Sequence, residues 1–304
     1  MAPMTLFYSD VFVLPLLSHH RFPMGKYARL RERLLATGEF GEGDFHVPEG
    51  ASDAQILRAH CPRYLERVVS GTLDDAQIRA IGFPWSPQMV ERSRRSSGAS
   101  LAAAREALTR GWSANLAGGT HHAFRDRGEG FCVFNDAAIA ARAMQVEAGL
   151  QRIAVIDCDV HQGNGTASIF ALDDSVFTFS IHGARNFPFA KEASDLDIEL
   201  ADGTGDDEYL WHLERGLDQT LERSRAQLVI YLAGADPYED DRLGRLKLTQ
   251  GGLARRDELV LGRLKARAIP VAIAMAGGYA RDIEDSIAIH ANTLCMARRI
   301  HADS

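Results

Sequence analysis

The sequence predicts an α/β protein of three layers, α/β/α, in which helices cover both faces of a mostly parallel β-sheet. Two observations predict this fold: short apolar runs recur along the chain, and helical patterns lie between them. The near-continuous apolar character of these runs is typical of parallel strands that are buried on both faces. We expect strands at positions 6–8, 112–116, 153–156, 176–181, 228–233 and 271–276.

The helices between these strands are also marked in the sequence. Asn135 and Asp136 can cap the first of three helices, and Gly149 can end it. Leucines recur at helical spacing in the second. The three helices are expected over 137–148, 208–223 and 253–268.

Composition limits the classes of function. The chain has 304 residues, 46% of them hydrophobic, and no linker is visible, so we expect a single domain over 1–304. The net charge of −7 argues against a dedicated nucleic-acid-binding protein, and Arg92, Arg94 and Arg95 are predicted to form a solvated helix face. No apolar run approaches the length of about 20 residues that spans a membrane. The cysteines are scattered without a Cys-x-x-Cys pair, so a soluble, cytoplasmic protein is expected.

Potential metal ligands follow two of the predicted strands. Asp157, Asp159 and His161 are spaced two apart after the strand at 153–156, so they fall on one side of an extended backbone. In parallel sheets, ligands bind beyond the carboxyl ends of the strands. Asp159, His161 and Asp236 are therefore a candidate three-ligand set for a divalent metal, most simply zinc, with one position open for water. Asp236 can also be interpreted as a residue of a turn.

Two adjacent histidines lie in a glycine-rich loop after the strand at 112–116. His121 and His122 can both face a cavity there, and histidine can accept and release protons near neutral pH. Asp157 and Asn164 are candidates to fix the ring tautomers. The alternatives are a structural metal site or a loop without a catalytic role.

Aromatic residues at other loops suggest how a substrate is held. Tyr279 follows two glycines at the end of the strand at 271–276, where its hydroxyl could donate to a developing oxyanion or simply be buried in the core. Phe131 and Phe187 could line a narrow apolar channel or act as packing residues. His182 is expected to be structural.

Taken together, these segments resemble the histone deacetylase superfamily, in the order in which the family carries them. The matching segments are Gly118-Gly119-Thr120-His121-His122-Ala123, Gly130-Phe131-Cys132-Val133-Phe134-Asn135-Asp136, Asp157-Cys158-Asp159-Val160-His161-Gln162-Gly163-Asn164-Gly165, Gly234-Ala235-Asp236 and Gly277-Gly278-Tyr279. Two further segments look most like the class IV branch and its bacterial relatives: His20-Arg21-Phe22-Pro23-Met24 and Asn186-Phe187-Pro188-Phe189-Ala190-Lys191.

The resemblance implies the arginase/deacetylase fold, with a central sheet of about eight strands. It implies one Zn²⁺ per chain, held by Asp159, His161 and Asp236. His122 would then be the general base and acid, and Tyr279 would polarise the amide carbonyl. The other site residues that the resemblance implies are His121 and its partner Asp157, and a substrate channel formed by Gly130, Phe131 and Phe187.

The resemblance also implies a structural monovalent cation, usually K⁺, beside the zinc. Its expected positions are Asp157, Asp159, His161, Ser180 and Ile181. Two residues depart from parts of the family. Asn164 replaces the aspartate of many class I members, which should lower the basicity of His122, and Leu243 stands where the polyamine-selective branch carries an acidic gatekeeper.

Three functions remain open from the sequence. The first is a zinc-dependent deacetylase that removes acetyl or longer acyl groups from lysine side chains of peptides or proteins, or from small acylated amines. The second is a binuclear manganese hydrolase of the arginase type, which would need further bridging carboxylates. The third is a protein that binds acylated ligands on the same fold without catalysis. Neither nucleic acid nor membrane is expected as a partner.

Overall fold

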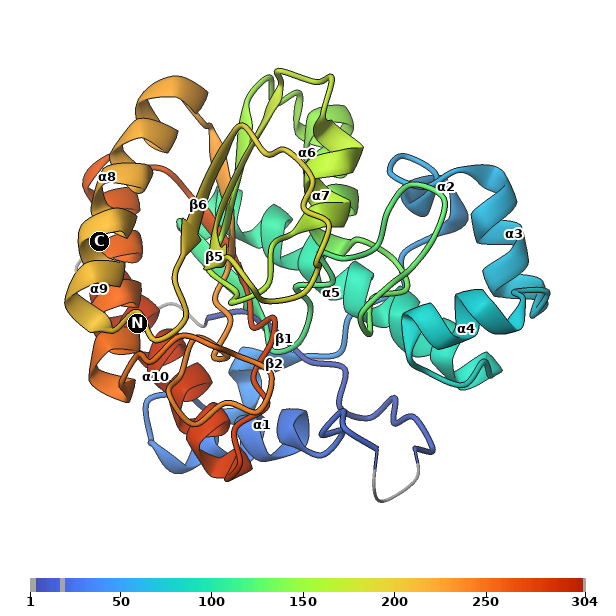
Figure 1. The fold of residues 1–304 in the computed structure, drawn as a ribbon, viewed down its shortest axis with the longest axis horizontal. Coiled ribbons are helices and arrows are strands. Elements are labelled where there is room, and N and C mark those ends of the chain that lie inside the picture. Colours follow the sequence, from blue (N-terminus) through green and yellow to red (C-terminus); the bar gives the residue numbers. More distant parts are fainter. Residues whose placement is uncertain (1–3, 17–19, 303–304) are drawn as a thin grey trace.

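The computed structural model describes residues 4–16 and 20–302, which form one eight-stranded sheet with helices on both faces (Figure 1). Every strand pairs in parallel with its neighbours, and the strand order is β2-β1-β3-β8-β7-β4-β5-β6. The predicted three-layer fold with about eight mostly parallel strands is therefore confirmed. The strands are β1 (Leu6–Phe7), β2 (Phe45–His46), β3 (Trp112–Asn115), β4 (Ile153–Asp157), β5 (Val176–Gly183), β6 (Leu196–Leu200), β7 (Leu228–Leu232) and β8 (Val271–Ala274).

All six strands expected from the apolar runs are present, with small shifts at their ends. The largest shifts are of two residues: β5 extends to Gly183, and β8 already ends at Ala274. Ala276 already has a positive φ of 54°, so the chain turns out of the sheet before Gly277. β2 and β6, which lie at the two edges of the sheet, were not predicted.

The helices form the two outer layers. In Figure 1, α1, α8, α9 and α10 lie on one side of the sheet, α5, α6 and α7 lie on the other, and α2, α3 and α4 extend beyond α5. Their bounds, with one 3₁₀ turn, are α1 (Lys26–Ala36), η1 (Glu42–Asp44), α2 (Asp53–Ile56), α3 (Pro62–Ser70), α4 (Asp75–Ile81), α5 (Pro87–Arg110), α6 (Asp136–Ala148), α7 (Asn164–Phe170), α8 (Asp206–Ser224), α9 (Gln250–Ala266) and α10 (Ile283–Ala302). None of these helices combines the length and apolar character needed to cross a bilayer.

The predicted caps of α6 are confirmed. The side chain of Asn135 accepts a hydrogen bond of 2.9 Å from the backbone N–H of Ala138, which satisfies one of the free donors of the first turn. Gly149 ends the helix in the left-handed conformation, with a φ of 68°.

Two apolar cores lie on opposite faces of the sheet, because successive side chains of a strand point to opposite sides. In β4, Ala154 and Ile156 pack into the core beneath α8, α9 and α10, while Ile153 and Val155 pack into the core beneath α5 and α6. Both faces of the strand are therefore buried and fixed. The carboxyl end of β4 is held between β5 and β7 as a consequence.

Candidate active site

The carboxyl ends of β4 and β7 bring the predicted metal ligands together. These strands pair directly, with Asp157 opposite Leu232, so the segments that follow them lie side by side. One ligand atom from each of Asp159, His161 and Asp236 lies within 4.8 Å of the other two, and all three residues are buried. We call this buried group, together with His121 and His122, the floor of the site.

The three residues fit a divalent metal. The Oδ2 atom of Asp236 is buried, and no hydrogen bond of good geometry satisfies it among the residues that the structure describes; its neighbour is His161 Nδ1 at 3.2 Å. A Cβ atom on Gly277 would lie 1.8 Å from this oxygen, so only glycine leaves the space between the carboxylates empty. Two carboxylates and one imidazole match the ligand preference of zinc and leave a position for water.

The charges of this group favour a cation. Burial disfavours a protonated His161, yet the carboxylates of Asp159 and Asp236 outweigh it and raise the pKa of His161 to about 10. Its Nδ1 atom lies 2.9 Å from Oδ1 of Asp159 and 3.2 Å from Oδ2 of Asp236. In this arrangement a proton on His161 occupies the place that a metal cation would take.

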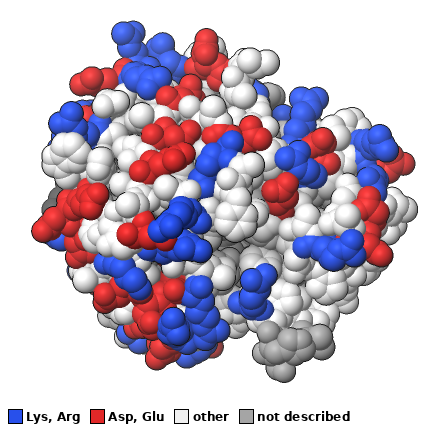
Figure 2. Space-filling model, in the orientation of Figure 1, with Lys and Arg blue, Asp and Glu red and all other residues white. Residues whose placement is uncertain are grey.

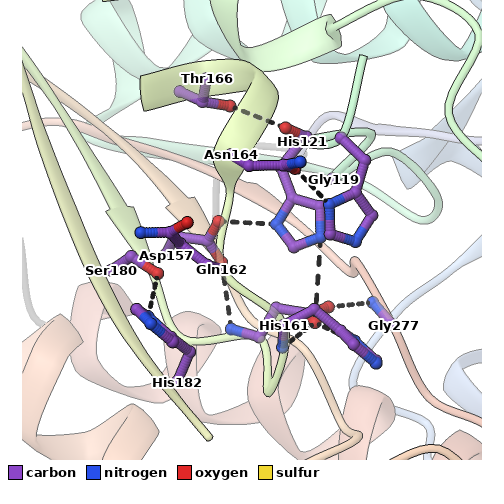
Figure 3. Close-up of polar contacts among 12 residues, drawn as sticks. Gly119, His121, Asp157, His161, Gln162, Asn164, Thr166, Ser180, His182 and Gly277 are labelled. Atoms are coloured by element: carbon purple, nitrogen blue, oxygen red, sulfur yellow. Dashed lines mark hydrogen bonds and ion pairs between the residues drawn. The ribbon is translucent and has the colours of Figure 1, made fainter. Parts of the chain in front are cut away.

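The adjacent histidines have different partners and opposite pKa shifts. His121 Nδ1 donates to the Asp157 carboxylate at 2.6 Å (Figure 3), and His122 Nδ1 donates to the amide oxygen of Asn164 at 2.7 Å. Against the effect of burial, Asp157 and Asp159 raise the pKa of His121 to about 9. Burial, reinforced by the charge of His121, lowers the pKa of His122 well below its usual value. These directions favour a neutral His122 with a free lone pair on Nε2, and a protonated His121 in the metal-free site.

A buried carboxylate that was not assigned to the site holds the histidine loop in place. Asp136 accepts hydrogen bonds from the backbone N–H of Gly119 at 3.0 Å and of Thr120 at 2.7 Å. The sequence indicated this residue as part of a helix cap and as the end of one segment that resembles the family, without a role in the site. No spacing pattern links it to a loop 16 residues earlier.

Tyr279 reaches the same cavity from the loop after β8. Its backbone N–H donates to Asp241 at 2.6 Å, and Lys26 donates to the preceding carbonyl of Gly278 at 3.2 Å. The enclosed position raises the pKa of Tyr279 well above its usual value, so the hydroxyl keeps its proton. Neither Asp241 nor Lys26 was predicted, because each lies far from Tyr279 in the sequence.

A cavity of about 480 Å³ connects the floor with the surface, and the predicted channel residues line it. The ring of Phe187 stands edge-on to that of His122, with 4.9 Å between the centroids. Phe131 belongs to an aromatic group with Phe22 and Tyr279, with ring centroids 5.4 Å and 6.2 Å away. A Cβ atom on Gly130 would come within 2.7 Å of His122, so glycine permits the narrow approach. Leu243 also lines the cavity.

The residues expected for the monovalent cation lie on two neighbouring strands. Asp157 at the end of β4 faces Ser180 in β5, and Ile181 follows Ser180. The Ser180 hydroxyl lies 2.9 Å from Nδ1 of the buried His182, as Figure 3 shows. The carboxylate and backbone oxygens at this strand end are hard ligands of the kind that K⁺ binds.

The expected solvated face of α5 is wrong for Arg92. This residue is only 7% exposed, and its guanidinium donates to the backbone carbonyls of Ser9 and Phe12. It also lines the inner part of the cavity. The prediction failed because α5 is packed against the protein over most of its length. A charged residue on such a helix can be buried when backbone oxygens accept hydrogen bonds from it.

Comparison with known proteins gives one consistent family. The profile of the histone deacetylase domain matches residues 20–294. The chain is 42% identical to an uncharacterised protein of Picosynechococcus sp., over 97% of this chain and 98% of that protein. It is 31% identical to histone deacetylase 2 of Arabidopsis thaliana, over 91% and 75% of the two chains.

A solved structure supports the same fold. The crystal structure of an HDAC homologue from Aquifex aeolicus matches with a TM-score of 0.80 at 20% identity, covering 98% of this chain and 88% of that one. The profile match across most of the sequence, the identity to a plant histone deacetylase and the shared fold lead to one conclusion. This chain belongs to the histone deacetylase family of amidohydrolases.

Proposed function

We propose that this protein is a zinc-dependent amidohydrolase that removes acetyl or longer acyl groups from lysine side chains or related acylated amines. The observation that carries the proposal is the meeting of three metal-ligand atoms, the neutral His122 and the phenol of Tyr279 in one cavity. A single ligand group of this kind occurs in residues 4–16 and 20–302, which favours one metal over a binuclear centre.

Asp159, His161 and Asp236 would hold the zinc, which supplies polarisation of the substrate carbonyl and of a water molecule. His122 Nε2 accepts a proton from the attacking water and returns it to the departing amine. Asn164 fixes the tautomer that leaves this nitrogen free. The protonated His121 adds positive charge beside the centre, where negative charge develops during attack.

The hydroxyl of Tyr279 donates a hydrogen bond to the carbonyl oxygen as that oxygen gains charge. Phe131 and Phe187 hold the aliphatic stem of the acylated side chain, and Gly130 leaves room for it. Asp157, Ser180 and Ile181, together with Asp159 and His161, would hold K⁺ behind the zinc. The described chain is proposed to act as one catalytic unit.

Removing the hydroxyl of Tyr279 tests this assignment. We expect Tyr279→Phe to lower kcat/KM on an acetyl-lysine peptide by about 100–1000-fold, as for the loss of one oxyanion donor. Tyr8→Phe removes a hydroxyl from a residue outside the cavity and should leave the rate unchanged. Equal rates for Tyr279→Phe and the unmodified protein would refute the assignment, and binding of the peptide without any turnover would favour the non-catalytic alternative.

A further inference from the structure

The sign of the charged residues that line the cavity changes from its floor to its opening. Among the described residues, the only carboxylates that line it are those of Asp159 and Asp236 on the floor, and every other permanently charged side chain there belongs to an arginine. These arginines are Arg21, Arg79, Arg92, Arg185 and Arg245. The chain as a whole carries a net charge of −7, so this excess of positive charge is local.

Four of these arginines lie at the opening of the cavity. Arg92 is buried and donates to backbone carbonyls, so it is not available to a partner outside. The other four are exposed, and we call them the mouth: Arg21, Arg79, Arg185 and Arg245. They come from four separate segments, so their grouping is a product of the fold.

The positive charge of the mouth is only partly neutralised within the protein. Arg185 and Arg245 share one carboxylate, that of Asp202, at 2.9 Å and 3.1 Å. Arg21 and Arg79 make no ion pair with any residue in the described part of the chain. On the face shown in Figure 2, basic and acidic side chains are interspersed. The mouth therefore has an excess of guanidinium groups over carboxylates.

The side chain of Leu243, near the entrance, adds no negative charge that would offset these arginines. Leu243 lines the cavity between Arg242 and Arg245 in the sequence and offers no carboxylate to a second amine of a substrate. Among the described charged side chains that line the cavity, a cationic substrate would meet only arginines before it reached the floor. Carboxylates that flank the acylated lysine of a substrate would meet guanidinium groups, which can bind a carboxylate in a bidentate manner with two parallel hydrogen bonds.

We propose that the mouth selects acylated lysines flanked by aspartate or glutamate, and disfavours basic peptides and cationic acylpolyamines. This inference rests on the proposed function and specifies its substrate class. Exposed charge pairs contribute modestly, but several acting together guide encounter and fix specificity. The scissile bond and the chemistry on the floor stay the same for every substrate.

Three acetyl-lysine peptides of equal length test the proposal, with acidic, uncharged or basic residues on both sides of the lysine. We expect kcat/KM to decrease in that order, by about tenfold from first to last at low ionic strength. The difference should appear mainly in KM. It should shrink in about 1 M salt, where charges separated by more than about 3 Å are screened.

Variants then assign the effect to the mouth. The double variant Arg21→Gln/Arg79→Gln should reduce the preference for the acidic peptide over the basic one by at least half. Arg33→Gln/Arg63→Gln removes the same charge from exposed positions that do not line the cavity and should leave the preference intact.

Affinity of the labelled peptides, measured by fluorescence anisotropy, gives the same ordering without turnover. If no peptide is hydrolysed but the acidic one binds most tightly, the proposed function fails and the selectivity of the mouth stands. Equal affinity for all three peptides, or an unchanged preference in the Arg21→Gln/Arg79→Gln variant, would overturn the inference.

Discussion

At the floor of the cavity, carboxylates and imidazoles meet in segments that follow strands of the sheet. At its mouth, arginines gather from three loops and the short helix α4, which are far apart in the sequence. The floor residues are buried and held by short polar contacts, such as the 2.9 Å between His161 Nδ1 and Asp159 Oδ1 and the 2.6 Å between His121 and its partner Asp157. The side chains of Arg185 and Arg245 at the mouth are 73% and 53% exposed. The side chains of the floor are thus fixed by the residues packed around them. The side chains of the mouth are positioned mainly by the backbone that carries them.

Because of this difference, we expect the floor to determine catalysis and the mouth to determine which substrate is preferred. Changes beneath the floor should alter stability or the pH range of catalysis, because buried charges respond strongly to the loss of a partner. Changes at the mouth should alter the choice of substrate by small factors and leave catalysis intact, because water screens exposed charges.

The largest effect is expected beneath the floor, at Arg256. Its buried guanidinium pairs with Asp257 at 2.8 Å and donates to the carbonyl of Gly234, two residues before Asp236. Arg256→Met leaves the Asp257 carboxylate buried without its counter-charge. We expect the free energy of unfolding, measured by urea denaturation, to fall by about 3–5 kcal/mol.

The matching change at the mouth is Arg245→Met, which should alter the free energy of unfolding by less than about 1 kcal/mol. The double variant Arg256→Met/Asp257→Leu removes both buried charges and should recover much of the lost stability. If the floor and mouth variants lose the same stability, the contrast between the two regions is wrong.

An intermediate effect is expected at Asn164. His122 must be neutral to accept a proton, so activity is present above its pKa and is lost as the pH falls through it. Burial and the charge of His121 lower this pKa, and the neutral Asn164 does little to oppose them. Asn164→Asp places a carboxylate on Nδ1, so the acid limb of kcat/KM should move up by about 1–3 pH units.

The pH profile of kcat/KM gives the measurement, and Asn292→Asp on α10 makes the same chemical change away from the cavity. The control should keep the unmodified profile. An acid limb that stays in place in Asn164→Asp would show that His122 is not the group that titrates.

The smallest effect is expected at Asp202, the carboxylate that Arg185 and Arg245 share. Asp202→Asn makes the mouth more positive, so the ratio of kcat/KM for the acidic peptide over the basic one should rise by about two- to fivefold. Competition between the two peptides measures this ratio directly. A falling ratio would mean that Asp202 acts by positioning the arginines and not by neutralising them.

Most of the floor could be predicted because its residues follow strands that the apolar runs mark clearly. Asp157, Asp159 and His161 follow the run that forms β4, and Asp236 follows the run that forms β7. In a parallel sheet, the carboxyl ends of such strands meet at one edge. The resemblance to a family supplied the roles of these residues, which spacing alone left open.

The remaining features were missed for different physical reasons. β6 alternates apolar and acidic residues over Leu196–Leu200, a signal of an edge strand that was present and overlooked. The two residues of β2 are too few to give any period. Asp136 and the mouth arginines depend on contacts between distant segments, which no local pattern encodes. Arg92 was misjudged because its neighbours suggested a solvated face, whereas backbone carbonyls stabilise it inside.

The most direct test of the account is a zinc titration of metal-free protein while hydrolysis of an acetyl-lysine peptide is followed. We predict no turnover without metal, a rise in proportion to added zinc, and saturation at one zinc per chain. Asp236→Asn should stay inactive throughout, because it loses one ligand of the group. Full turnover by the metal-free protein, or a requirement for two metals per chain, would contradict a mononuclear centre on Asp159, His161 and Asp236.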